Sequence, residues 1–185
     1  MKTNNFQKLE QFALPKNFRG RSSLMVQLWW IVQSSLFACS PQFMYGWRRF
    51  LLRLFGAKVG QGVLIRPTVR VTYPWKVVLG DFTWVGDNVE LYSLGPIEVG
   101  SNVVISQRSY LCAASHDYTS VSFTMLAKKI VIQDEVWIAT DVYVAPGVTI
   151  GRGALIGARS SVFGDMPPGM ICIGSPASPV KPRLP

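Results

Sequence analysis

Histidine and cysteine are both scarce in this chain of 185 residues. It has one histidine, His116, and three cysteines, at positions 39, 112 and 172. The cysteines are odd in number, widely spaced and without a C-x-x-C pair, so they indicate neither a disulfide framework nor a zinc site. A single histidine likewise cannot supply a metal centre built on several imidazoles. We therefore expect no bound metal ion and a reducing compartment.

Acidic residues are almost missing from the amino-terminal part of the chain. Residues 1–80 contain twelve Lys or Arg and a single acid, Glu10, for a net charge of +11, whereas residues 81–185 contain seven basic and nine acidic residues, for a net charge of −2. Together they give the +9 of the whole chain. This distribution favours a local anionic partner near the amino terminus, and it argues against nucleic acid bound along the whole chain.

Long apolar runs are also absent. The first twenty residues are polar, so no secretory signal is expected, and we expect a cytoplasmic protein. Residues 22–47 carry no charge, but they contain no apolar stretch of eighteen residues, which makes a membrane-spanning helix the less favoured alternative. The run is interrupted by Gln27, Gln33, Ser34, Ser35 and Pro41.

A period of six residues dominates the chain between Val59 and Val162. One aliphatic side chain opens each unit, and a small or β-branched residue follows four positions later. The aliphatic positions are Val59, Ile65, Val71, Leu79, Val85, Leu91, Val99, Ile105, Leu111, Ile132, Ile138, Val144, Ile150, Ile156 and Val162. A fixed short period means that each unit buries its apolar side chain only by stacking on its neighbours.

Six residues fit neither a helix nor a simple alternating strand, but they fit a short strand followed by a turn. Three units make one triangular rung, and rungs joined by parallel ladders stack about 4.8 Å apart. The fifteen units predict a mainly β fold, a parallel β-helix of about five rungs over residues 58–166. Two-residue insertions at Val77-Val78 and Ile97-Glu98 are interpreted as corner insertions, and residues 117–129 as a long loop.

Residues 1–57 read as a polar arm and two helices, at about 24–38 and 45–55. The structural interpretation is that the helices cap the open end of the column. The alternative is that residues 22–57 also contact an anionic membrane from the cytoplasmic side. In that case three tryptophans would sit at headgroup depth and three arginines would meet phosphates. These residues are Trp29, Trp30, Trp47, Arg48, Arg49 and Arg53.

His116 stands at the corner where the regular pattern releases the long loop, in Ser115-His116-Asp117-Tyr118. Long loops in compact folds are often functional, so an imidazole at this place is a candidate general base. Asp117 is a candidate for orienting it. The competing interpretation is that His116 only anchors the loop.

Several motifs strengthen the catalytic interpretation. The stretches Gln27-Leu-Trp-Trp30, Tyr45 to Gly56, Tyr73-Pro-Trp75, Tyr110-Leu-Cys112 and Ser115 to Tyr118, together with the repeats, resemble hexapeptide-repeat acyl-CoA-dependent O-acetyltransferases, closest to the colanic acid (exopolysaccharide) biosynthesis type. The resemblance implies a left-handed β-helix, acetyl-CoA as donor, a sugar hydroxyl as acceptor, and a homotrimer with sites at subunit boundaries.

The resemblance also implies roles for particular residues. His116 would take the proton of the sugar hydroxyl, and the backbone amide around Ala139-Thr140 would stabilise the oxyanion. CoA would lie near that turn and the carboxy-terminal tail, residues 167–185. The implied CoA-binding residues are Ala139, Thr140, Ala158, Arg159, Lys181 and Arg183.

The chain departs from the family pattern at Phe163-Gly164 and at Ser178, which removes two polar or cationic contacts from the expected phosphate site. Arg159 and Arg152 are possible substitutes for them. Among other proteins with this repeat, γ-class carbonic anhydrases need three histidines and are excluded. A non-catalytic hexapeptide scaffold remains as the alternative function.

Overall fold

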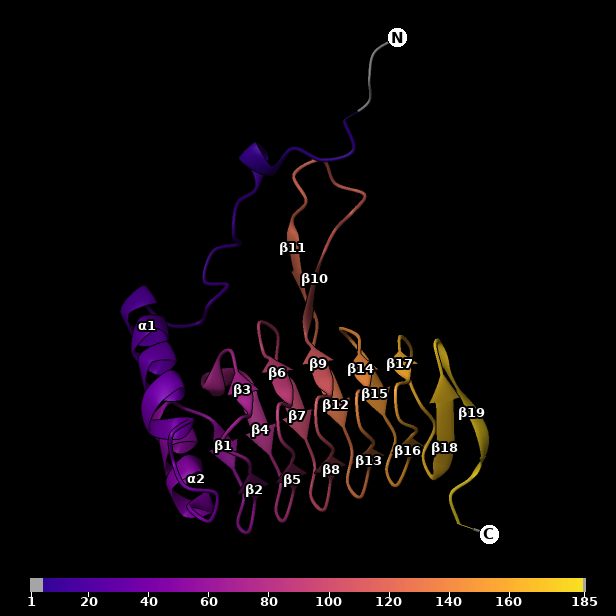
Figure 1. Cartoon of the computed structure of the whole chain (residues 1–185). Helices are drawn as coiled ribbons and strands as arrows, with labels where there is room; N and C mark the ends of the chain where they lie inside the picture. The colour runs from indigo at the N-terminus through magenta and orange to yellow at the C-terminus, as the bar shows by residue number, and fades with distance from the viewer. Residues whose placement is uncertain (1–4, 185) are drawn as a thin grey trace.

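The computed structural model describes residues 5–184, and its main feature is a three-sided column of short parallel strands (Figure 1). The three sides are called sheets A, B and C. Sheet A contains β1 (Lys58–Val59), β4 (Val77–Leu79), β7 (Ile97–Val99), β12 (Ile130–Ile132) and β15 (Thr149–Ile150). Sheet B contains β2 (Leu64–Ile65), β5 (Trp84–Val85), β8 (Val104–Ile105), β13 (Trp137–Ile138), β16 (Leu155–Ile156), β18 (Met170–Gly174) and β19 (Ala177–Pro182). Sheet C contains β3 (Arg70–Val71), β6 (Glu90–Tyr92), β9 (Tyr110–Cys112), β14 (Tyr143–Val144) and β17 (Ser161–Val162).

The hexapeptide pattern explains the core of this column. All fifteen aliphatic residues of the period are buried, and equivalent residues of successive turns are ladder partners, as with Val59, Leu79 and Val99 in sheet A. The small residues four positions later, such as Val63 and Ser109, are buried at the corners. The predicted parallel β-helix is therefore confirmed.

The column is slightly longer than the predicted five rungs. Beyond the fifteenth unit, Met166 forms a parallel bridge to Ile150, and β18 pairs in parallel with β16. The chain thus makes about six turns. The sixth was not predicted because it buries Cys172 in place of an aliphatic residue of the hexapeptide pattern. The tail expected at residues 167–185 contains this strand, and β19 pairs with it antiparallel.

Two helices close the opposite end of the column. They are α1 (Ser23–Val32), which a π-helical turn, η2 (Gln33–Phe37), continues, and α2 (Tyr45–Leu54). The Ser22 hydroxyl caps α1 by accepting a 3.3 Å hydrogen bond from the amide of Met25. Shorter 3-10 turns lie at η1 (Leu9–Gln11) and η3 (Pro74–Lys76). Both predicted helices are present, and Figure 1 shows them stacked on the first turn.

The arginines of α2 point toward the column. Arg48 is fully buried, and its guanidinium donates to the carbonyls of Ile65, at 2.6 Å, and of Pro41 and Gln42. Arg49 donates to the Val63 carbonyl at 2.8 Å. The prediction that these side chains bind lipid phosphates is wrong for Arg48, because its donors bind the Ile65 carbonyl at the open end of the column and two carbonyls of the segment between the helices instead.

Arg53 does the same at the neighbouring strand, donating to the carbonyls of Val59 and Gly60. The tryptophans divide differently. Trp29 is fully buried and donates to the Val71 carbonyl at 2.7 Å, so its predicted place at headgroup depth is wrong. Trp47 is half-buried and donates to the Leu36 carbonyl, whereas Trp30 is 47% exposed. Among residues 5–184, no helix has the length and apolar character needed to cross a bilayer.

Candidate active site

A two-stranded antiparallel arm carries His116 away from the column. It consists of β10 (Ala114–His116) and β11 (Met125–Ala127), with His116 paired opposite Met125. The arm leaves the third turn after β9 and returns to sheet A through β12, so it stands at the corner between sheets C and A (Figure 1). The backbone pairing of this arm fixes the position of His116 outside the column.

The imidazole of His116 is held by the far side of the arm. Its Nδ1 lies 2.8 Å from the carbonyl oxygen of Phe123, and the two rings stack with centroids 4.2 Å apart and planes only 8° from parallel. A carbonyl only accepts, so Nδ1 carries the hydrogen, and in the neutral form of the ring the lone pair is at Nε2. This is the tautomer that a general base requires.

Asp117 does not orient the imidazole. Its carboxylate accepts hydrogen bonds from the hydroxyl and the amide of Thr119, at 2.5 and 2.9 Å. These bonds hold the pKa of Asp117 below its ordinary value. The predicted role of Asp117 is therefore replaced by the Phe123 carbonyl, a backbone group that side-chain identity could not reveal.

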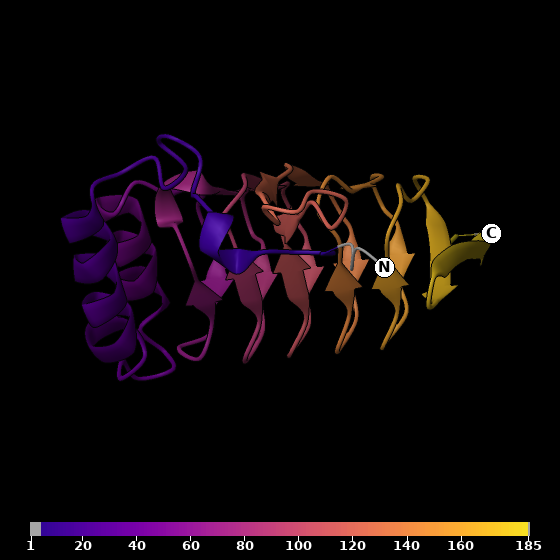
Figure 2. The ribbon, with the colours of Figure 1, turned by 90° about the horizontal axis from the view of Figure 1, so that it is seen from above.

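The amino-terminal arm, residues 5–21, reaches across to the same place. The amide of Lys8 donates to the Val121 carbonyl at 2.7 Å, and the Phe12 ring lies 5.8 Å from the imidazole of His116 between ring centroids. Seen from above, this segment passes over the column to the tip of the His116 arm (Figure 2). The environment of His116 thus contains a residue more than a hundred positions away in the sequence.

Two side chains of η3 anchor the carboxy-terminal end of that segment. The indole of Trp75 donates to the Arg19 carbonyl at 2.7 Å, and the ammonium of Lys76 donates to the Phe18 carbonyl at 2.6 Å. The corner insertion was predicted at Val77-Val78, but these residues belong to β4, and η3 forms the corner just before them. This corner has a structural task. It fixes the path by which the amino terminus reaches His116.

Four of the other six predicted site residues gather at the corner between sheets B and C. Ala139 and Thr140 follow β13, and Ala158 and Arg159 follow β16 one turn further along the column. The amide of Arg159 donates to the Thr140 carbonyl at 2.9 Å, and the Thr140 hydroxyl donates to the Gln107 carbonyl at 3.0 Å. These four residues therefore form one continuous edge.

This edge presents unused backbone donors. Within residues 5–184, the amides of Thr140 and Ala158 donate no hydrogen bond, whereas the neighbouring amides of Ala139 and Arg159 are both used in the ladder. Free amides at a turn are the groups that an oxyanion hole requires. They also suit the carbonyl oxygens of an extended ligand.

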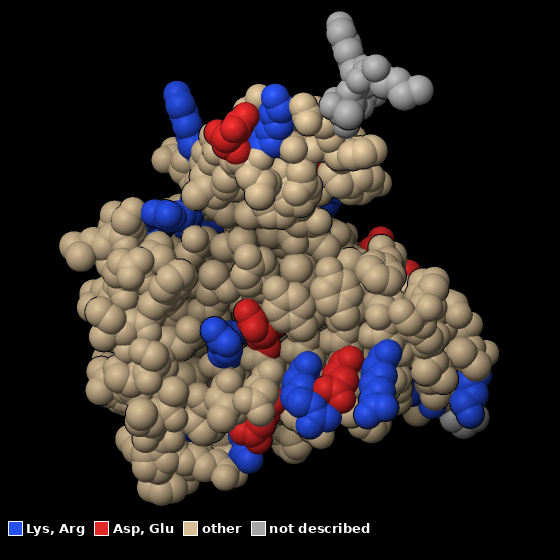
Figure 3. Space-filling model, turned by 45° about the horizontal axis from the view of Figure 1, so that its top comes forward, with Lys and Arg blue, Asp and Glu red and all other residues tan. Residues whose placement is uncertain are grey.

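The same edge carries alternating charges. Arg108 binds the Asp141 carboxylate with two hydrogen bonds of 2.7 and 2.8 Å, and these bonds hold the pKa of Asp141 below its ordinary value. Arg159 is exposed one turn away, and among the described residues it forms no ion pair. Figure 3 shows charged side chains gathered below a largely uncharged face, with the arm above it. Arg159 is thus available to an anionic ligand.

Lys181 and Arg183 are not brought to this edge. The guanidinium of Arg183 donates to the carbonyls of Glu135 and Gly153, at 2.8 and 3.0 Å, which lie at the corner between sheets A and B. Lys181 is exposed on β19 opposite Ile171. Arg152 is also at the corner between A and B, where it pairs with Glu135 at 2.7 Å.

The tip of the β18–β19 hairpin does reach the edge. The Gly174 amide donates to the Ser160 hydroxyl at 3.1 Å, directly beside Ala158 and Arg159. Ser178 pairs with Ile173 next to this tip, so its position in the tail is close to the predicted CoA site. Phe163 lies on sheet C instead, 61% exposed and in contact with the Tyr143 ring.

Sheet C separates the two halves of the site. His116 stands at one border of this sheet and Thr140 at the other, and an aromatic strip runs along its outer face. Neighbouring ring centroids in the strip are 5.8, 6.0 and 5.7 Å apart. Burial raises the pKa of Tyr143 to about 12 and that of Tyr110 above its ordinary value, so these phenols stay neutral. The strip consists of Tyr92, Tyr110, Tyr143 and Phe163.

The sequence did not single out Phe12, Phe123 or the aromatic strip. The strip had a signal, because Tyr92, Tyr110 and Tyr143 each directly follow or precede the buried aliphatic residue of a sheet C strand. Phe12 had none, since its contact with His116 depends on the tertiary path of the amino terminus. Within residues 5–184, no group of three or more His, Cys, Asp or Glu side chains could hold a metal ion.

Comparison with known proteins agrees with this architecture. A family profile described as bacterial transferase hexapeptide (six repeats) matches residues 129–164. The Escherichia coli K12 protein named as a colanic acid biosynthesis acetyltransferase, WcaF, is 57% identical over 178 residues, which span 96% of this chain and 98% of that protein. The galactoside O-acetyltransferase of the same organism is 28% identical over 72% of this chain and 68% of that protein.

Solved structures show the same fold. The hexapeptide-repeat acetyltransferase VCA0836 of Vibrio cholerae, in complex with acetyl coenzyme A, superimposes with a TM-score of 0.78 and 25% identity, covering 88% of this chain and 91% of that one. A galactoside acetyltransferase in complex with coenzyme A gives a TM-score of 0.80 over 91% and 83% of the two chains, at 24% identity.

Fold and repeats thus define a left-handed parallel β-helix of the hexapeptide class. Within that class, the chain belongs to the family of the colanic acid biosynthesis acetyltransferases and is an acetyltransferase. The resemblance inferred from the sequence motifs is confirmed.

Proposed function

We propose that this protein transfers the acetyl group of acetyl-CoA to a hydroxyl of a saccharide, in exopolysaccharide synthesis or on a lipid-linked precursor. The acceptor is supported by the relative that is named for the biosynthesis of colanic acid, an exopolysaccharide. The donor is supported by the structural neighbour that was solved in complex with acetyl coenzyme A. The observation that carries the chemistry is the imidazole of His116, whose Nδ1 lies 2.8 Å from a carbonyl and whose Nε2 forms no hydrogen bond with any residue from 5 to 184.

The proposed reaction has two steps, addition and elimination, and each step includes one proton transfer. Nε2 of His116 takes the proton of the sugar hydroxyl as its oxygen attacks the thioester carbonyl carbon, forming the C–O bond. The amide of Thr140 stabilises the oxyanion of the tetrahedral intermediate. The C–S bond then breaks, and the imidazolium returns its proton to the leaving thiolate. No enzyme nucleophile is needed, because the thioester is already activated and positioning contributes much of the rate.

Two copies must contribute to each site. His116 and Thr140 of one chain lie on opposite borders of sheet C, so one copy supplies the base and its neighbour the edge with the free amides. A homotrimer with three such sites at its subunit boundaries satisfies this requirement. Light scattering at micromolar concentration should give three times the chain mass, and a monomer would contradict the assembly.

For CoA we propose the edge formed by Ala139, Thr140, Ala158 and Arg159, with Arg159 on a phosphate. Lys181 and Arg183 were implied by resemblance alone, and the second of them already binds two carbonyls. Replacement of Arg159 by Glu should raise the KM for acetyl-CoA about tenfold with little change in kcat, since a reversed charge repels phosphate in both ground and transition states.

The decisive experiment measures thiol release from acetyl-CoA against a panel of sugars and lipid-linked oligosaccharides. His116→Ala should reduce turnover about 10²- to 10⁴-fold, the usual contribution of a general base, without unfolding the column. Turnover near that of the native protein in this variant would remove His116 from the mechanism. No turnover with any acceptor would favour the non-catalytic scaffold.

We also propose that the helical cap contacts an anionic membrane from the cytoplasmic side. The cap reverses the usual arrangement of a surface helix, because its arginines face the column and its apolar side chains face outward. No acidic residue occurs between Glu10 and Asp81. Exposed basic groups border it at Lys16, Arg21, Arg53 and Lys58. The apolar surface of the cap consists of Leu24, Leu28, Ile31, Leu36, Phe43, Phe50 and Leu54, each 47% exposed or more.

Each Lys or Arg near an anionic surface contributes about 1 kcal/mol, and a trimer presents three caps at the same end of its columns. The protein should therefore float with anionic vesicles at low salt and be released as salt rises. Failure to float at low salt would leave the cap with a structural role alone. Flotation that persists in high salt and alkaline wash would contradict peripheral binding.

A further inference from the structure

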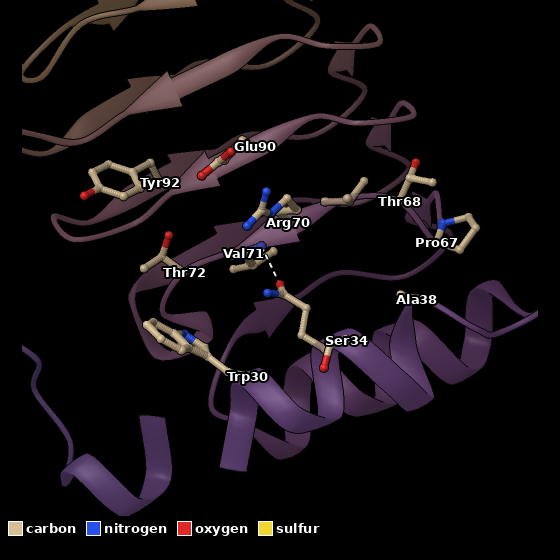
Figure 4. Close-up of a pocket in the computed structure, with 12 residues that line it drawn as sticks. Trp30, Ser34, Ala38, Pro67, Thr68, Arg70, Val71, Thr72, Glu90 and Tyr92 are labelled. Atoms are coloured by element: carbon tan, nitrogen blue, oxygen red, sulfur yellow. Dashed lines mark hydrogen bonds between the residues drawn. The ribbon is translucent and has the colours of Figure 1, made fainter. Parts of the chain in front are cut away.

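A groove of about 620 Å³ lies where the cap meets sheet C. One wall is the exposed side of α1 and η2, and the other is formed by β3, β6 and the turn before β3 (Figure 4). Gln33 fixes the two walls together, because its side-chain oxygen accepts the amide of Val71 at 2.6 Å. The groove is thus a formed feature of the cap–column junction, and its volume suits a small ligand.

Three polar side chains of the groove form no hydrogen bond within the described chain, whereas Gln33, Ser34 and Thr68 do. Arg70 and Glu90 are ladder partners on adjacent strands and are both solvent-accessible, yet among residues 5–184 neither forms an ion pair or a side-chain hydrogen bond. The Thr72 hydroxyl beside them is also without a partner in the described chain. In Figure 4 these three groups line the same hollow. They offer donors and acceptors to a ligand.

Two aromatic rings accompany these polar groups. Trp30 is 47% exposed on the cap side, and Tyr92 is half-buried on the sheet side, with both rings drawn at the same end of the hollow (Figure 4). A sugar ring has apolar C–H faces and a rim of hydroxyls, so it matches aromatic faces combined with planar charged groups and hydroxyls. One positive and one negative side chain leave the lining with no net charge, which disfavours CoA phosphates.

The groove also lies on the route that an acceptor would follow. Tyr92 is the first ring of the aromatic strip, and the second, Tyr110, belongs to the strand that continues into the His116 arm. The cap forms the other border of the groove. A saccharide chain attached at a membrane would therefore pass the groove before it reached His116.

We infer that this groove binds a sugar unit of the acceptor other than the unit that is acetylated. The inference rests on the proposed function in taking the ligand to be part of the acceptor. It makes the enzyme selective for a saccharide chain over a free monosaccharide, with recognition at the first two turns of the column and chemistry at the third.

Direct binding tests this without any turnover. Calorimetry of the native protein is carried out with maltotetraose, cellotetraose and β-1,4-galactotetraose, and with glucose and galactose as monosaccharide probes. We expect at least one tetrasaccharide to bind about tenfold more tightly than either monosaccharide, and absence of binding by all three would overturn the inference. Trp30→Ala and Arg70→Ala should each weaken that binding about tenfold. Trp84→Ala is the matched control, because this tryptophan is 54% exposed on sheet B outside the groove and should change binding less than twofold.

His116→Ala distinguishes this inference from the proposed function. This variant should keep full tetrasaccharide binding. If the native protein binds a tetrasaccharide but acetylates no acceptor, the transferase proposal fails and the inference about the groove stands. If Trp30→Ala kept native tetrasaccharide binding but lost flotation with anionic vesicles, Trp30 would belong to the membrane surface and the sugar groove would be refuted.

Discussion

The two ends of the column solve the same problem in opposite ways. Each end leaves backbone groups of a terminal turn without a further turn to pair with. At the first turn, arginines of α2 donate to these carbonyls, and the outer side of the helices is apolar. At the last turn, β19 adds an antiparallel strand, and its own edge carries Pro179 and Pro182, which lack an amide hydrogen.

The difference indicates which end of the column binds another surface. Prolines and a lysine on an edge strand prevent further pairing, so the carboxy-terminal end is protected against the addition of a strand from another chain. An apolar surface bordered by basic residues is costly to expose in water and marks an interaction site. The comparison thus supports a membrane contact at the cap and none at the opposite end.

The largest effect is expected from removing the buried guanidinium. Arg48→Met keeps the length of the side chain but leaves the carbonyl of Ile65 buried without its donor, and it removes the hydrogen bonds to Pro41 and Gln42. The free energy of unfolding should fall by about 3 to 5 kcal/mol in urea denaturation at fixed protein concentration. Lys181→Met, an exposed cation at the other end, should change it by less than about 0.5 kcal/mol. Equal losses for the two variants would erase the difference between the ends.

The next effect concerns the outer surface of the cap. The double change Leu28→Ser and Ile31→Ser removes two exposed aliphatic side chains one helical turn apart and touches no buried group. Partition onto anionic vesicles should fall about 100-fold, since each large aliphatic side chain contributes about 1.5 to 3 kcal/mol when it leaves water. Val180→Ser, 60% exposed on β19, should leave partition unchanged. A comparable loss in that control would mean that the column binds lipid without regard to its ends.

A smaller effect separates the inside of the cap from its outside. Trp29→Phe loses the 2.7 Å hydrogen bond to Val71 and part of a fully buried ring, so it should destabilise the fold by about 1 to 3 kcal/mol. Trp30→Phe changes a neighbouring but half-exposed ring and should cost less than about 0.5 kcal/mol. Thermal and urea unfolding of the pair measure this, and a reversed order would contradict the inverted packing of α1.

The smallest effect is expected at the carboxy-terminal end. Arg183→Ala loses two hydrogen bonds to the carbonyls of Glu135 and Gly153, at a site that water can reach, and should cost about 1 kcal/mol. The KM for acetyl-CoA should stay within twofold of the native value. A KM that rises tenfold at unchanged stability would instead assign Arg183 to the phosphates, as the family resemblance implies.

Much of the fold was predictable because a six-residue period has few physical solutions. Every aliphatic position from Val59 to Val162 is buried. The insertions predicted at 77–78 and 97–98 were misplaced by a few residues, because these residues belong to β4 and β7, and the corners between sheets C and A are residues 72–76 and 93–96. The sixth turn was missed because Met166 and Cys172 lack the aliphatic signature. The burial of Arg48 was missed as well, since an arginine reads as polar until the carbonyls around it are known.

The candidate site was predictable only in its side-chain part. His116 could be found because it is the one histidine and stands where the period breaks. Its orientation depends on the Phe123 carbonyl, and its surroundings on Phe12, and neither contact has a sequence signature. Arg159 and Arg183 look equivalent as exposed cations, but the structure places them at different corners of the column.

The arginine contacts of α2 also bear on the order in which the segments of the chain fold. During synthesis the cap emerges before any turn of the column, so its arginines are already present when the first strands leave the ribosome. Each completed turn then offers a paired edge to the next, and assembly of the column proceeds from the amino terminus one turn after another, as nearest-neighbour stacking allows. Phe12 completes its contact with His116 only after the third turn has formed. The segment made first is thus among the last to reach its place, and it closes around the base once the column that carries it exists.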